Sequence, residues 1–202
     1  MTSKERVHRT IDRKSIDRVP YSFDLTSRIA MMLSEHYGVL PEKFHQIPAG
    51  VDGVRVGEDW GLQQGLIMGP RLWKKFLKPR LKMLYAAIRR KGLRVMIHSC
   101  GDIAEIMPYL IELGVEVVHP VQPEAMDVSF LQREYGRDLV FYGALGSQST
   151  LVYGNPKDIV AEARGRLTLF KDGGYILGPA GAISTDARPE TVIALTDFAM
   201  NL

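Results

Sequence analysis

Apolar runs and amphipathic stretches of helical period alternate along most of this chain. Four near-continuous apolar runs have the length of buried strands, at residues 93–98, 115–122, 138–146 and 174–183. A helix-like stretch follows each of them, at residues 102–114, 128–136, 155–170 and 188–200. Strands that are apolar on both faces and separated by helices are typical of a parallel sheet covered on both sides. We therefore predict an α/β fold.

The first half of the chain carries weaker signals of the same kind. They predict strands at residues 18–23 and 51–61, a helix at 27–38 and a basic helix from 71 onward. Pro79 is expected to kink or divide the basic helix, because proline lacks the backbone N–H that the helix needs. The pattern thus gives about six strands in a single domain that spans residues 1–202.

Chemically useful residues follow the predicted strands at the points where the strands end. In parallel β/α units the carboxyl ends of the strands lie on one side, so we expect these residues to converge on one mouth. They are Glu58, Asp59, His98, Cys100, His119, Gln122, Gly143 and Gln148, with Gln64 close behind the acidic pair.

The composition is that of an ordinary globular protein, with 46% apolar and 24% charged residues. One cysteine excludes an internal disulfide and suits a reducing compartment. The polar, charged N-terminus is unlike a secretory signal, and no apolar stretch approaches the ~20 residues of a membrane span. We expect a cytoplasmic protein with no membrane partner.

Residues 71–94 contain ten Lys or Arg and no acidic residue. Such a block can mark a nucleic-acid or phosphate-bearing partner. Apolar residues interleave with it at helical spacing, however, so an outer helix with a solvated basic face is the preferred interpretation. No stacking platform or nucleic-acid motif accompanies the block, and we expect no nucleic-acid partner. The helix could alternatively dock an acidic partner.

Several motifs occur in a familiar order. They are "EDWGLQQG", "HSCGDI", "HPVQPEAMD", "VFYGALGSQSTL", "GNPKDIVAEARGRL" and "GGYILGPAGAISTDARPETVIAL". Together they resemble the uroporphyrinogen decarboxylase superfamily, which includes the decarboxylase of haem biosynthesis and zinc-dependent, corrinoid-linked methyltransferases. The resemblance implies a TIM-type (β/α)8 barrel.

The chain is short for such a barrel, which typically takes ~250 residues. Relative to the family, a long segment is missing between the first predicted helix and "VDGVRVGEDWG". One interpretation is an internal deletion or a degenerate paralogue. The other is a natural minimal form that closes its sheet edge through a homodimer or a rearranged N-terminus.

The resemblance to the methyltransferase branch implies a zinc site at "HSCG". His98 and Cys100 match the zinc-binding His and Cys, whereas the third ligand position falls at or next to Gly181, which has no side chain to offer. Catalytic zinc normally has three protein ligands, so Glu58, Asp59 or His119 would have to take that place. A methyl donor such as methylcobalamin, a corrinoid, is implied with the zinc, and the basic helix could then dock an acidic corrinoid protein. The decarboxylase itself uses no metal.

The same residues have other roles open to them. Cys100 precedes a predicted helix, whose dipole would favour a thiolate, but it could equally be a small buried residue. Glu58 and Asp59 could act as acid and base or form a surface turn. The remaining candidates for binding substrate or cofactor are Gln64, His119, Gln122, Gly143 and Gln148.

Three functions remain open from the sequence. The first is a methyltransferase-like enzyme that acts on a methylated small molecule or a corrinoid. The second is uroporphyrinogen decarboxylation, although the arginine-rich N-terminal signature is absent and only Arg18 and Arg28 stand near its place. The third is a catalytically inactive paralogue with a binding or scaffold role.

Overall fold

The computed structural model describes residues 1–21, 36 and 52–202. Apart from His36, the predicted helix 27–38 lies outside the described residues, as do Arg28 and the end of the predicted strand 18–23.

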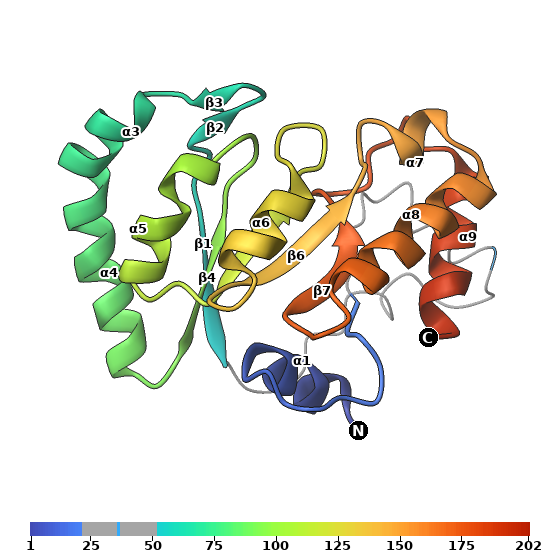
Figure 1. Cartoon of the computed structure of the whole chain (residues 1–202), viewed down its shortest axis with the longest axis horizontal. Helices are drawn as coiled ribbons and strands as arrows, with labels where there is room; N and C mark the ends of the chain where they lie inside the picture. Colours follow the sequence, from blue (N-terminus) through green and yellow to red (C-terminus); the bar gives the residue numbers. More distant parts are fainter. Residues whose placement is uncertain (22–35, 37–51) are drawn as a thin grey trace.

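A five-stranded parallel sheet forms the centre of the fold (Figure 1). Its order is β1 (Gly53–Gly57), β4 (Arg94–His98), β5 (Val117–Val121), β6 (Val140–Leu145) and β7 (Tyr175–Pro179). Within the described residues, the predicted strand 18–23 is reduced to one parallel bridge between Tyr21 and Leu177 of β7. The first extended segment therefore lies beside the last strand, as in a sheet that closes on itself.

Helices follow the strands as the amphipathic pattern predicted. They are α5 (Met107–Glu112) after a short 3-10 turn (Ala104–Ile106), α6 (Val128–Tyr135), α8 (Pro156–Leu169) and α9 (Pro189–Met200). Asn155 begins α8 as expected, with its side chain accepting hydrogen bonds from the backbone N–H groups of Lys157 and Asp158.

The basic segment forms one continuous run of helix made of α3 (Gly69–Leu72), a π-helical stretch (Trp73–Leu77) and α4 (Lys78–Arg90). The π-helical stretch ends two residues before Pro79, so the helix passes the proline by widening locally rather than by dividing.

Three further elements were not predicted. They are α1 (Ser3–Ile11), the hairpin of β2 (Gly61–Leu62) and β3 (Gly65–Leu66), and α7 (Thr150–Tyr153). Helix α1 lies at the end of the sheet where the strands begin, opposite the hairpin (Figure 1).

Alternate residues of each strand face two different environments. On β4, Val95 and Ile97 belong to the main core beneath the helices. Met96 points to the other face, where it packs against a smaller cluster formed by Val117, Val140, Tyr142 and Ile176. Val7 and Ile11 of α1 also pack against this inner cluster. His98 shares the inner face with Met96, because residues two apart in a strand point the same way.

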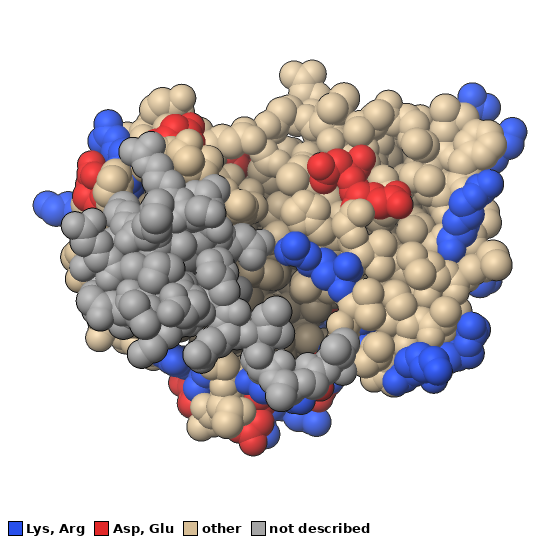
Figure 2. Space-filling view, turned by 180° about the vertical axis from the view of Figure 1, so that it is seen from behind, with Lys and Arg blue, Asp and Glu red and all other residues tan. Residues whose placement is uncertain are grey.

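A cavity of about 450 Å³ lies between the inner face of the sheet and α1. Figure 2 views the molecule from behind Figure 1, and its surface is hollowed beside basic side chains there. The cavity is mostly apolar and lies towards the beginning of the strands, with Met96, Val117 and Tyr142 in its lining. Among the described residues, no helix has both the length and the apolar character that a membrane span requires.

Candidate metal site

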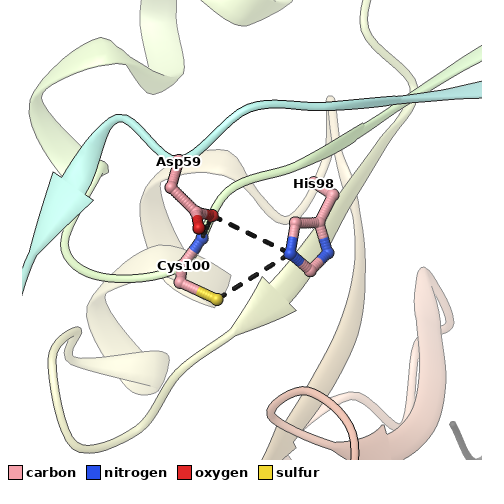
Figure 3. A group of neighbouring side chains, drawn as sticks. All are labelled: Asp59, His98 and Cys100. Atoms are coloured by element: carbon pink, nitrogen blue, oxygen red, sulfur yellow. Dashed lines mark hydrogen bonds and ion pairs between the residues drawn. The ribbon is translucent and has the colours of Figure 1, made fainter.

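Three potential metal ligands meet where β1 and β4 end (Figure 3). The Nε2 atom of His98 lies 3.8 Å from Oδ1 of Asp59 and 3.8 Å from Sγ of Cys100. The ligand atoms of all three residues lie within 4.8 Å of one another. His98 and Cys100 thus turn towards the same point, and Asp59 joins them from the loop after the neighbouring strand.

Backbone contacts explain why Asp59 reaches this point. The amide of Cys100 donates a hydrogen bond to Oδ1 of Asp59 at 2.9 Å, and the amide of Trp60 donates to Oγ of Ser99 at 3.0 Å. Further along, the amide of Asp102 donates to the carbonyl of Leu62 at 2.7 Å. The "EDWGL" and "HSCGD" segments are therefore bonded together residue by residue.

The second ring nitrogen of His98 faces another histidine. Its Nδ1 lies 2.9 Å from Nδ1 of His119, which is almost fully buried and opposite His98 in the register of β4 and β5. The ring of His119 in turn packs against Tyr142, with centroids 4.3 Å apart. A hydrogen bond through Nδ1 fixes the orientation of the His98 ring and leaves Nε2 directed at Asp59 and Cys100.

Three glutamines connect the loops around the cluster. The buried Gln122 accepts a hydrogen bond from the amide of Gly101 at 3.1 Å and donates to Gln63 at 3.4 Å. Gln63 donates to the side chain of Gln148 at 2.9 Å. Gln63 was not among the sequence candidates, and the predicted Gln64 lies exposed in the turn beside it. Gln63 and Gln64 form the turn between β2 and β3, and the two-residue strands on either side are too short for their pattern to indicate which glutamine faces the site.

Glu58 and His119 lie outside the three-residue cluster. The carboxylate of Glu58 accepts a hydrogen bond from the indole N–H of Trp60 at 3.2 Å. His119 contacts Nδ1 of His98, whereas Asp59 faces the other ring nitrogen, Nε2. Of the three residues proposed to stand in for Gly181, the structure brings Asp59 to the cluster.

Of the two other roles open to Cys100, activation by a helix dipole has no support, because no helix begins directly after it. The first helical residue after it is Ala104, in a 3-10 turn of three residues. Burial and the nearby carboxylate of Asp59 raise the pKa of the Cys100 thiol instead. Without a bound cation, Cys100 is therefore a poor nucleophile near neutral pH.

The two glycines singled out in the sequence differ in their surroundings. Gly143 is buried within β6 at φ +111°, where its carbonyl accepts a hydrogen bond from the hydroxyl of Tyr175 at 2.7 Å. Its close neighbours are other parts of the protein, including the carbonyl of Pro179. Gly181 has φ +115°, and a Cβ built on it would meet nothing within 4 Å.

The donor set of the cluster fits zinc. Zinc accepts carboxylate oxygen, imidazole nitrogen and thiolate sulfur at about 2.0–2.3 Å, and ligands of one tetrahedral ion lie roughly 3.3–3.8 Å apart. The two separations of 3.8 Å to Nε2 of His98 need little or no inward movement to meet that geometry.

Comparison with known proteins assigns the chain to a family. The family model for uroporphyrinogen decarboxylase (URO-D) matches residues 44–202. The chain belongs to the uroporphyrinogen decarboxylase family. The five parallel strands and their helices are accordingly part of a barrel of this family's type. The fold class predicted from the sequence, an incomplete barrel of β/α units, is confirmed.

Solved structures similar to this member of the uroporphyrinogen decarboxylase family include the following example. It is a methyltransferase from Methanosarcina mazei, with a TM-score of 0.61, 23% sequence identity, and coverage of 76% of this chain and 43% of that chain. This chain therefore matches less than half of the length of that protein, and the likeness shows the fold alone. No curated protein matches the sequence.

Proposed function

We propose that this member of the uroporphyrinogen decarboxylase family is a zinc-dependent methyltransferase that moves a methyl group from a corrinoid or methylated small molecule to a thiol. The observation that carries the proposal is the meeting of Asp59, His98 and Cys100 at the carboxyl ends of β1 and β4. The similar structure from Methanosarcina mazei is a methyltransferase, and this supports testing methyl transfer first.

Zinc, when bound, would hold a substrate thiol as a thiolate near neutral pH and so make it a nucleophile. Asp59 and Cys100 supply the negative charge that retains the cation, and His119 holds the His98 ring with Nε2 directed at the site. These three ligands leave a fourth position for the incoming thiol, as catalytic zinc sites do.

The glutamine chain offers a means of orienting a polar substrate. Gln63 and Gln148 are exposed at the rim of the site and bonded to each other, whereas Gln122 is buried and fixed by Gly101. Amide groups carry both donors and acceptors, so the exposed pair can bind neutral or charged polar groups of a substrate.

A direct assay tests the proposed reaction. Purified protein with added zinc is mixed with methylcobalamin and a small thiol, and the methyl thioether, Co(I) cobalamin and released proton are the expected products. Cys100→Ser and Asp59→Asn should lower the rate to that without protein. Asp172→Asn removes an exposed carboxylate elsewhere and should leave the rate unchanged.

Decarboxylation of uroporphyrinogen is the second candidate, because the matching family model bears that name. The same preparation is offered the porphyrinogen under anaerobic conditions, and the loss of carboxyl groups is followed by mass spectrometry. Decarboxylation that persists in Cys100→Ser would replace the methyltransferase proposal. Inactivity in both assays would favour the binding or scaffold role.

A further inference from the structure

Large apolar side chains are unusually exposed along one stretch beside the candidate site. Among the described residues, seven of the eleven exposed large apolar side chains lie between positions 62 and 84. We call these seven the apolar patch: Leu62, Ile67, Met68, Leu72, Phe76, Met83 and Leu84. Leu62 is 59% exposed, Phe76 46% and Met83 76%. Single exposed apolar residues are normal, but a concentration of this kind marks an interaction surface.

The helix that carries most of the patch is apolar on two faces. Trp73, Leu81 and Tyr85 are buried against the core. Met68, Leu72 and Phe76 follow one another at intervals of four residues, which places them close together along the helix surface. The first face accounts for folding, whereas the second has no such explanation among the described residues.

The segment that carries the patch bears basic side chains and no acidic ones. No Asp or Glu occurs between Asp59 and Asp102. Lys74 and Lys78 turn towards α5, where Lys74 bonds the hydroxyl of Tyr109 at 3.2 Å and Lys78 bonds Glu112 at 2.6 Å. The exposed cations left to border the patch are Arg71, Lys75, Arg80 and Lys82. In Figure 2, basic side chains gather along the edge of the molecule where α4 lies.

The patch adjoins the candidate metal site through the hairpin. Leu62 follows Asp59 by three residues, and its carbonyl accepts the hydrogen bond from the amide of Asp102. The hairpin and α3 lie at the same end of the sheet as the ends of β1 and β4 (Figure 1). A partner seated on the patch would therefore stand beside the mouth of the site.

We propose that the apolar patch docks a protein partner that has an apolar centre and an acidic border. Charge complementarity selects this partner, because exposed cations border the patch and complementary charge steers association. A symmetric contact between two copies would bring two basic borders together, which like-charge repulsion disfavours. The inference goes beyond the proposed function and does not depend on the reaction catalysed.

Site-specific photocrosslinking tests this surface in the cells from which the chain derives. A benzophenone amino acid replaces Leu72 or Phe76, and in a control it replaces Tyr153, which is 77% exposed on α7. The captured protein is then identified, purified and titrated against the purified chain. We expect the captured protein to be acidic, with a higher crosslinking yield at positions 72 and 76 than at position 153. In the titration it should bind one to one, and its affinity should fall as the salt concentration rises.

Variants separate the apolar contribution from the charged one. Leu72→Ser with Phe76→Ser, and Lys75→Glu with Arg80→Glu, should each raise the Kd at least about tenfold. Arg137→Glu with Lys157→Glu makes the same charge change at exposed positions elsewhere and should leave the Kd unchanged. Circular dichroism and the Tm check that each variant is folded.

Three outcomes would overturn the docking proposal. They are the absence of capture above the control, crosslinking to a second copy with a dimer seen by light scattering, and binding to phosphatidylglycerol vesicles that the same variants abolish. Cys100→Ser should retain full affinity for the partner, since its substitution lies in the proposed metal site. Failure of the zinc chemistry and failure of the docking surface are thereby distinguished.

Discussion

Gly61 and Gly101 lie against each other so closely that a Cβ on Gly101 would fall 2.4 Å from the carbonyl carbon of Gly61. A Cβ on Gly61 would in turn fall 2.6 Å from the carbonyl oxygen of Cys100. This contact lets the loop after β1 lie on the loop after β4, and it brings Asp59 to His98 and Cys100.

Substitution of Gly101 by alanine should therefore destabilise the protein. Its φ of +76° disfavours any side chain, and the added methyl group would meet backbone that cannot turn aside. We expect a loss of about 1–3 kcal/mol in the free energy of unfolding, measured by urea denaturation. Gly165→Ala, within α8 and with nothing near the new Cβ, should instead stabilise by about 0.5–1 kcal/mol. Equal stability of the two variants would contradict the close contact.

His119 should control zinc affinity without being a ligand. His119→Phe keeps a ring against Tyr142 but removes the hydrogen bond to Nδ1 of His98. We expect zinc to bind about 10–100-fold more weakly, as measured by competition with a chromophoric chelator. Tyr142→Phe retains the ring contact and serves as the control. Unchanged affinity in His119→Phe would show that His98 is oriented by other contacts.

Cys100 of the metal-free protein should react slowly with iodoacetamide near neutral pH. Burial and the negative charge of Asp59 raise the pKa of the thiol, so the reactive thiolate is scarce. Asp59→Asn removes the charge and should lower that pKa, which moves the pH profile of alkylation to lower pH. An unchanged profile would mean that the carboxylate does not act on the thiol.

The ion pair of Arg6 and Asp17 should make stability depend on acidity. Arg6 donates two hydrogen bonds to Asp17, at 2.7 and 2.8 Å, and thereby lowers the pKa of that carboxyl far below its usual value. A carboxyl with a lowered folded-state pKa stabilises the protein above its unfolded pKa of about 4, and this stabilisation is lost as the pH falls.

Arg6→Met should therefore lose stability at neutral pH and differ less from the unmodified protein below about pH 4. Urea denaturation at several pH values measures the difference. A stability difference that stays constant from neutral to acid pH would contradict the role of the ion pair.

The sheet was predictable because its strands are short, apolar and separated by clear helices. Helix α1 was missed because its mean character is polar and its buried positions include Arg6 and Thr10. A signal was nevertheless present, since Thr2 and Glu5 have the spacing of a capping box and form one. A buried arginine depends on its ion pair for burial, and a pattern of apolar residues cannot reveal that partner.

The location of the candidate site was predictable from the sequence, whereas the full set of its residues was not. His98 and Cys100 are two residues apart on one strand end, so their common direction follows from the sequence. The choice of Asp59 over Glu58 depends on how the next loop is bonded, in particular on the amide of Cys100 and the hydroxyl of Ser99. Contacts between loops that are 40 residues apart have no periodic signature along the chain.

The zinc content of the purified protein tests the central claim most directly. The chain is purified without chelator, and its metals are measured by mass spectrometry against protein concentration, beside Asp59→Asn, Cys100→Ser and the exposed control Asp172→Asn. The account predicts about one zinc per chain in the unmodified protein and in the control, and a marked loss in the other two variants. Zinc absent from the unmodified protein, or retained in full by both Asp59→Asn and Cys100→Ser, would contradict it.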